Sequence, residues 1–264
     1  MTDRADQTIK ALRSGLDDLA ALVRGLGEQD LARTSGASQW DVSQVLSHLG
    51  SGAEISLAGL QGALAGTGAP SGDFIRGVWA RWDGMSRAER AAEFATANEA
   101  LVRRFEDLDP RARQDLRIEL WWPSEPLDVA GYAAMRLSEF THHTWDVKAA
   151  TDPGAALAPE AVELLLDTAG GLVGFVGKAD GLGGRTASVA VRTTAPARSL
   201  GLHVGGTVTL TAAPDTPDAT LEAPAEWWLR LVSGRHAPGH TPPAVRLTSA
   251  TLTLDDLRRV FPGF

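Results

Sequence analysis

The sequence predicts two domains of different fold class: a four-helix bundle over residues 1–152 and a smaller α+β domain over residues 153–264. Two observations carry this prediction. Before a turn at residues 151–154, apolar residues recur at helical spacing in four long segments. After that turn, short alternating runs typical of strands are mixed with shorter helical segments. Helices in series followed by mixed elements favour an α domain joined to an α+β domain.

Each of the four long helices has its own start or stop signal. Gly27 ends the first pattern, Trp40-Asp41-Val42 precedes the second, Asp109-Pro110 ends the third, and a proline at 126 opens the fourth. Gly50 and Gly52 weaken the second pattern. The predicted bounds are 3–26, 42–66, 86–108 and 127–150.

The C-terminal segment alternates between helical and extended patterns. Val204-Gly205-Gly206-Thr207 is a hairpin signal between two short strands. A helix with paired tryptophans and a last short helix follow. Helices are predicted at 159–176, 225–232 and 254–260, and strands at 188–193, 200–204, 207–211, 219–222 and 244–247.

The composition excludes several classes of function. The chain of 264 residues has no cysteine, which excludes disulfides, thiolate metal sites and a catalytic cysteine of its own. A net charge of −8 with no basic block disfavours nucleic acid as a partner. The sequence lacks a long apolar span and a signal-peptide pattern, so no membrane partner and a cytoplasmic location are expected. We expect a monomer or homodimer that acts on a small molecule.

Histidines on two of the predicted helices are candidate metal ligands. Glu139 and His143 are four residues apart, so they differ by about 40° around the helix axis and share a face. His48 lies in an otherwise apolar stretch of the second helix, where an unpaired imidazole is costly to bury. If these helices are neighbours, two nitrogens and a carboxylate oxygen converge. Three protein ligands with one open position are the ligand set of catalytic zinc.

Other interpretations of these residues remain open at this point. A lone histidine on an apolar face is more often a hydrogen-bonded core residue, and a Glu-His pair at this spacing is common on helix surfaces. Arg136 lies one turn before Glu139 and could pair with it instead, which would argue against a metal site. His142 also lies close to Glu139 along the chain, although on its other side.

Two motifs resemble a known family. Trp40-Asp41-Val42 followed by His48, and the pattern Glu-x-x-x-His-x-Trp-Asp at residues 139–146, resemble the DinB-like, mycothiol-dependent maleylpyruvate isomerase family of actinobacteria. Residues 225–235, an apolar helix that ends in Gly-Arg, resemble that family's C-terminal domain, which is similar to sterol carrier proteins. The resemblance covers nearly the whole chain and selects His143 over His142.

The resemblance implies a thiol-dependent metalloenzyme. His48, Glu139 and His143 would hold zinc or another divalent metal, and the open position would receive the thiol of mycothiol as thiolate. Family members either isomerise a cis enoyl acid by reversible thiol addition or act as S-transferases. Asp146 would orient a neighbouring group, with a surface or capping role as the alternative. Arg235 would bind a substrate carboxylate, with a solvated loop arginine as the alternative.

Two functions of other classes are alternatives to a thiol-dependent enzyme. The C-terminal domain could be a non-catalytic module that binds a small molecule or lipid, with the bundle as its scaffold. The chain could also be a stress-associated DinB-like metalloprotein without turnover, because a shared fold does not fix a function. A converging His, Glu and His favours the enzyme. Trp40 and Trp145 are expected to be packing residues.

Overall fold

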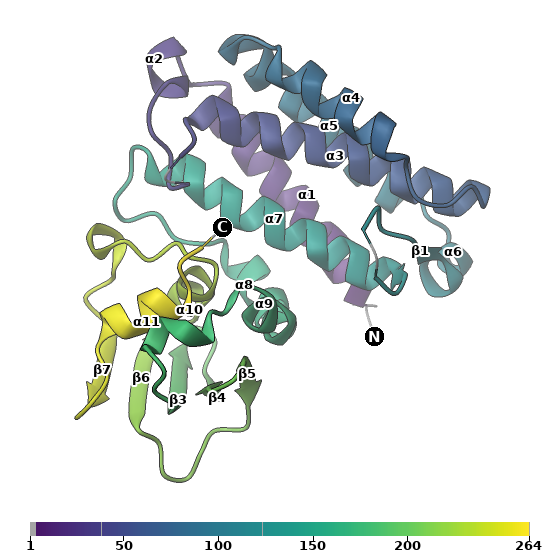
Figure 1. The fold of residues 1–264 in the computed structure, drawn as a ribbon. Helices are drawn as coiled ribbons and strands as arrows, with labels where there is room; N and C mark the ends of the chain where they lie inside the picture. Colours follow the sequence, from purple (N-terminus) through teal and green to yellow (C-terminus); the bar gives the residue numbers. More distant parts are fainter. Residues whose placement is uncertain (1–3, 38, 123, 264) are drawn as a thin grey trace. The chain divides into compact units, whose positions relative to one another are not determined.

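The structure of the protein is a computed structural model that describes residues 4–37, 39–122 and 124–263 (Figure 1). The chain divides into two compact units, Met1–Thr151 and Asp152–Phe264. The first unit is helical, and the second holds a five-stranded mixed sheet with helices. The predicted fold class is therefore confirmed.

Four long helices form the bundle of the first unit (Figure 1). They are α1 (Arg4–Val23), α3 (Val42–Ala65), α5 (Arg87–Glu106) and α7 (Val129–Ala149). Helices α1 and α3 each pack against both α5 and α7. The sequence predicts all four, and the largest difference is at α1, which ends at Val23 instead of residue 26.

Side-chain caps explain where three of these helices begin. The carboxylate of Asp41 accepts a hydrogen bond from the backbone N–H of Gln44 at 2.9 Å, which caps α3. Ser86 and Asp128 cap α5 and α7 in the same way. The fourth helix consequently starts two residues later than predicted, because Leu127 and Asp128 form strand β2, which pairs with β1 (Arg117–Ile118).

A helix between residues 72 and 83 was not predicted. Helix α4 (Gly72–Asp83) follows a Gly/Pro-rich segment and is capped by Ser71, whose hydroxyl accepts from the N–H of Phe74. It packs on α3 and buries Ile75, Val78 and Trp82. The short helices α2 (Glu28–Leu31) and α6 (Pro110–Asp115) were also not predicted.

The second unit is built on a sheet with the strand order β5-β4-β3-β6-β7. Strand β3 pairs antiparallel with β4 and parallel with β6, so the sheet is mixed. The predicted hairpin is confirmed, because β4 and β5 pair with Val204 opposite Val208. The strands are β3 (Ala187–Thr194), β4 (Arg198–Val204), β5 (Val208–Thr211), β6 (Ala219–Pro224) and β7 (Arg246–Ser249).

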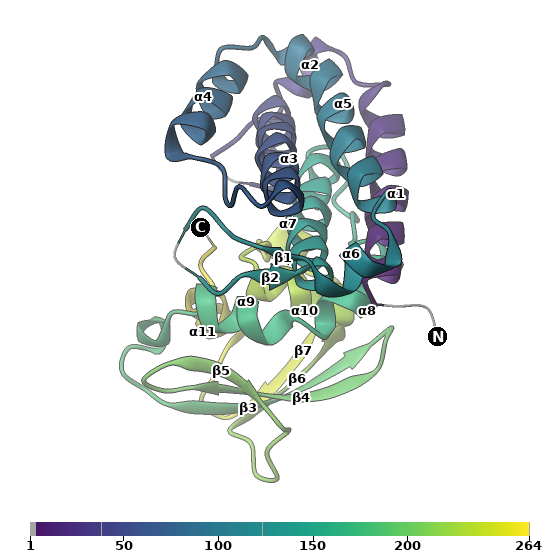
Figure 2. The ribbon, with the colours of Figure 1, turned by 90° about the vertical axis from the view of Figure 1, so that its right-hand side faces the viewer.

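Helices cover one face of this sheet, as Figure 2 shows. Val189 and Leu221 of the sheet and both tryptophans of α10 (Ala225–Val232) are fully buried. The other face carries exposed polar residues such as Arg192 and His203, which is usual for a sheet with one solvated face. Helices α10 and α11 (Leu254–Val260) have the predicted bounds, whereas the predicted helix 159–176 is two helices, α8 (Pro159–Leu166) and α9 (Ala169–Val176).

No helix in the described part of the chain is long and apolar enough to cross a membrane.

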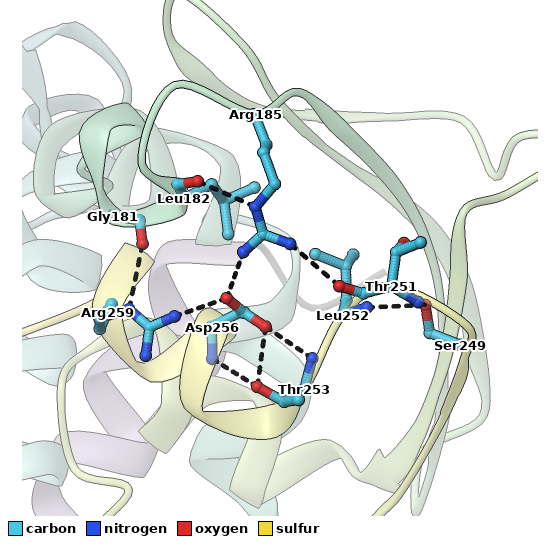
Figure 3. A network of polar contacts seen from close by, with 9 residues as sticks. All are labelled: Gly181, Leu182, Arg185, Ser249, Thr251, Leu252, Thr253, Asp256 and Arg259. Carbon is cyan, nitrogen blue, oxygen red and sulfur yellow. Dashed lines mark hydrogen bonds and ion pairs between the residues drawn. The ribbon is translucent and has the colours of Figure 1, made fainter.

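A polar network anchors α11 to the rest of the second unit (Figure 3). The buried carboxylate of Asp256 accepts hydrogen bonds from the backbone N–H and the hydroxyl of Thr253, both at 2.8 Å. The guanidinium groups of Arg185 and Arg259 bind its other oxygen. The hydrogen bonds from Thr253 and the pairing with Arg185 lower the pKa of Asp256 to about 2.

This low pKa predicts a stability that depends on pH. The pKa is lower in the folded chain than in the unfolded chain, so the contribution of Asp256 is present above about pH 4 and is lost as the pH falls through 2. Solvent screens the two half-exposed arginines, which leaves a contribution of about 1–2 kcal/mol. The free energies of unfolding of the protein and of an Asp256→Asn variant should therefore converge between pH 5 and pH 2. A constant difference over that range would contradict the prediction.

Candidate metal centre

Three polar side chains from α3 and α7 converge at one end of the bundle. His48 lies in the second turn of α3, and Glu139 and His143 lie on successive turns of α7. The Nε2 atom of His48 is 3.0 Å from Oε2 of Glu139, and Nε2 of His143 is 3.7 Å from the same oxygen. Helices α3 and α7 are neighbours in the bundle, and this places all three predicted ligands close together.

The donor atoms fit a small divalent cation. Each of the three residues offers one ligand atom, and these atoms lie within 4.8 Å of one another. Zinc binds such nitrogen and oxygen donors at about 2.0–2.1 Å, and tetrahedral geometry then places two ligands roughly 3.3 Å apart. The separations of 3.0 and 3.7 Å lie on either side of this value. His48, Glu139 and His143 could therefore hold a metal ion.

The cluster is open to solvent on one side. The side chains of His48 and Glu139 are 37% and 44% exposed, whereas that of His143 is 12% exposed. Three donors on one side and solvent on the other leave room for a further ligand from outside the chain. This arrangement differs from a structural zinc site, in which four protein ligands close the coordination sphere.

The buried carboxylate of Asp146 orients one of the two imidazoles. Its Oδ2 atom is 2.8 Å from Nδ1 of His143, and its side chain is fully buried. With the proton on Nδ1, His143 donates to this carboxylate, and the lone pair on Nε2 faces Glu139. Among the two roles considered for Asp146, the geometry supports orientation of a neighbouring group.

The loop before α3 places an indole ring over both imidazoles. The ring centroid of Trp40 is 5.1 Å from that of His48 and 5.8 Å from that of His143. The loop is attached to α7 by the backbone N–H of Gly36, which donates to the carbonyl oxygen of Asp146 at 2.9 Å. A Cβ atom on Gly36 would lie 2.6 Å from the ring of the buried Trp145, so only glycine allows this approach. Sequence reasoning did not find the contribution of Gly36, since a glycine in a polar loop usually signals only a turn.

Arg136 does not form the pair with Glu139 that would argue against a metal site. Its guanidinium is buried and donates to the backbone oxygen of Leu49 and to Oδ1 of Asn98, at 3.5 and 3.4 Å. Gly52 provides the space, because a Cβ atom there would lie 2.9 Å from this guanidinium. Arg136 therefore acts on Glu139 as a nearby positive charge and leaves its carboxylate free for another ligand.

The surrounding charges keep Glu139 ionised. Partial desolvation by the surrounding protein would by itself raise the pKa of this carboxyl group. The hydrogen bond with His48 and the electrostatic effects of His143, His48 and the Arg136 cation more than offset that effect, so the pKa lies well below its usual range. A carboxylate that stays ionised at neutral pH is the form that binds a cation.

The other sequence candidates lie elsewhere. His142 is buried, and its Nδ1 is 2.8 Å from the backbone oxygen of Ser138, so it is not part of the cluster. Arg235 belongs to the second unit, where it follows Gly234 in the left-handed region and donates to the carbonyl oxygen of Ser233 at 3.1 Å. Its predicted role in binding a carboxylate stays a prediction.

The fold and the cluster define a class of protein: a helical bundle with a candidate three-donor metal centre, followed by an α+β unit. The chain belongs to the mycothiol maleylpyruvate isomerase N-terminal domain family, which matches residues 12–148.

Solved structures of a mycothiol-dependent maleylpyruvate isomerase share the fold over nearly the whole chain. The crystal structure of that enzyme is 13% identical in sequence, with a TM-score of 0.66, and the match covers 96% of this chain and 98% of the other. The structure of a histidine-to-alanine mutant of the enzyme gives the same values. No protein with curated annotation matches the chain.

Proposed function

We propose that the protein is a zinc-dependent enzyme that binds mycothiol and adds its sulfur to an electrophilic small molecule. The observation that carries the proposal is the convergence of His48, Glu139 and His143 around a solvent-open position, in a chain of this family. A scaffold or simple binding module has no need of three such donors in one place. The absence of cysteine agrees with a nucleophile that comes from outside the chain.

Each residue of the centre has a role that follows from its geometry. His48, Glu139 and His143 would hold the metal, which supplies the positive charge that keeps a thiol as thiolate near neutral pH. Asp146 holds His143 with Nε2 towards the donor cluster. The indole of Trp40 shields both imidazoles from water on one side.

The same addition of sulfur serves two reactions. In a cis–trans isomerase the sulfur adds to an activated double bond, the new single bond rotates, and elimination releases the thiol and the trans product. In an S-transferase the reaction stops at the thioether, which forms either by addition to a double bond with uptake of a proton or by displacement of a leaving group such as a halide. Arg235 would bind a carboxylate of the substrate through its planar fork, which suits the isomerase substrate maleylpyruvate.

Metal removal and thiol titration test this function together. We expect the zinc-reconstituted protein to contain one zinc per chain and to bind mycothiol by calorimetry, and the chelator-treated protein to bind it at least tenfold more weakly. The methyl thioether of mycothiol, which cannot form a thiolate, is the matched ligand control. Equal affinity of the two protein forms, or of the two ligands, would show that the thiol does not depend on the metal.

A further inference from the structure

Three tryptophan side chains gather at the surface of the first unit near the start of α7. Trp121 and Trp122 lie in the connection between β1 and β2 and are 50% and 39% exposed, and Trp79 of α4 is 41% exposed. Their rings meet edge to face, with centroids 5.3 Å apart for Trp121–Trp122 and 5.9 Å for Trp79–Trp121. So much exposed aromatic surface in one place is typical of a binding site.

This cluster borders a narrow cleft between α3 and α7. The cleft has a volume of about 40 Å³, well below the roughly 150 Å³ that encloses a benzene ring, so a ring would lie across its mouth against the exposed indoles. Its apolar walls include Ile55 of α3, Met135 of α7, and both Trp121 and Trp122. We call these four residues the aromatic groove. At the bottom of the cleft the hydroxyl of Tyr132 already donates to the backbone oxygen of Ser56 at 3.0 Å. The floor therefore offers an occupant little hydrogen bonding, and shape and apolar contact would decide what binds.

The aromatic groove lies on the same faces of α3 and α7 as the candidate metal centre, further along both helices. Ile55 follows His48 by seven residues, which places it on the same face of α3 about 10 Å further along the axis. Met135 precedes Glu139 by four residues, which places it about 6 Å away on the same face of α7. A single small molecule can span this distance, with one end at the metal centre and the other between the tryptophans.

Charge and shape indicate which end of the molecule lies in the groove. The exposed carboxylate of Glu119 lines the cleft beside the two tryptophans, so a second negative charge there would be repelled. Flat rings stack on indole faces or meet them at an edge, and the negative face of an indole also attracts positive charge. These features do not suit a small dicarboxylic acid and do suit a ring that carries no negative charge.

We propose that the aromatic groove binds a planar ring of the substrate that carries no negative charge, and that an electrophilic carbon on a chain attached to this ring then lies at the metal centre, about 6–10 Å away along the two helices. This inference rests on the proposed function and narrows its substrate to aryl-bearing electrophiles. It favours S-transfer over isomerisation of a small acid. Trp121 and Trp122 are the residues that select the substrate by its ring.

Ligand-detected NMR on the full chain without zinc measures the Kd of a probe for the groove, independently of any reaction. The probe is 1,3-dinitrobenzene, a flat neutral ring with no leaving group. We expect the double variant Trp121→Ala/Trp122→Ala to raise its Kd at least tenfold, and Trp121→Phe/Trp122→Phe, which keeps two rings, to raise it less than threefold. Phe175→Ala, which removes a 75% exposed ring in α9, is the control and should leave the Kd unchanged.

A second measurement compares two electrophiles with zinc and mycothiol present. Because the chain has no cysteine, iodoacetamide reports only on mycothiol. In the alanine double variant, we expect the ratio of kcat/KM for N-(2-phenylethyl)iodoacetamide, which carries the same reacting carbon on a chain beyond a ring, to that for iodoacetamide to fall about tenfold.

The two measurements separate the inference from the function on which it rests. If the alanine double variant binds 1,3-dinitrobenzene with an unchanged Kd, the groove is not a substrate site. The same conclusion follows if the double variant keeps its Kd but changes its oligomeric mass, because the tryptophans would then form a contact between chains. Conjugation of mycothiol to iodoacetamide would then still support the proposed function. A changed Kd without conjugation of either electrophile would instead contradict the proposed function and leave the ring-binding groove.

Discussion

Replacing Glu139 with glutamine is expected to weaken zinc binding by more than about 100-fold. Loss of an outer residue that only orients a ligand costs about 10–100-fold in metal affinity, and loss of a direct charged donor should cost more. The amide keeps the size of the side chain and can still contact His48, so the effect isolates the negative charge. The nearby buried cation Arg136 adds to the loss, since without the carboxylate it repels the metal.

Competition with a chromophoric chelator measures this affinity. The matched control is Glu93→Gln, an exposed glutamate of α5 in the same unit, which should bind zinc as the unaltered protein does. Thermal unfolding of both variants checks that they are folded. Zinc affinity of Glu139→Gln within threefold of the unaltered protein would rule out Glu139 as a ligand, and with it the proposed centre.

The candidate site could be predicted from the sequence where it depends on helical spacing. Glu139 and His143 share a face of α7 wherever that helix begins and ends, because they are four residues apart. Only the packing of α7 against α3 had to be inferred. The roles of Arg136 and Gly52 could not be derived in this way. The position of a buried arginine beside a glycine depends on how three helices pack together. Residues that are close in the sequence do not indicate that packing.

The fold shows the same division between local and long-range information. The long helices carry caps and periodic apolar faces that are readable from neighbouring residues, and Ser86 with Glu89 is one such cap. Helix α4 was missed because its apolar residues, Ile75, Val78 and Trp82, form a narrow stripe among exposed residues after a Gly/Pro-rich segment. The break between α8 and α9 at residues 167–168 has no glycine or proline to mark it.

Glycine was the least reliable guide, because the same residue type that signals a break in a helix also permits close packing. Gly50 weakens the pattern of α3 in the sequence, yet α3 continues through it without interruption. The ring of Trp82 occupies the position that a side chain at residue 50 would take. This contact lies one helical turn or less from His48, so the packing of α4 on α3 supports the segment that carries the first histidine.

Replacing Gly50 with alanine is accordingly expected to destabilise the first unit by about 1–2 kcal/mol. A Cβ atom at this position would lie 2.1 Å from the ring of Trp82, which is fully buried and donates from its indole N–H to Glu54 at 3.0 Å. Either the indole or α4 must move, and overpacking of a close-packed core costs about 1–3 kcal/mol. The higher helix propensity of alanine offsets less than about 1 kcal/mol of this.

Gly77→Ala is the matched control, because the two substitutions add the same methyl group inside a helix. Gly77 lies on the exposed side of α4 with no neighbouring atom within 4 Å of a new Cβ, so alanine should stabilise the unit by about 0.5–1 kcal/mol. Urea unfolding followed by tryptophan fluorescence measures both changes. Opposite signs for the two variants would show that Trp82 fixes residue 50 as glycine, whereas stabilisation by both would mean that the indole does not fill that space.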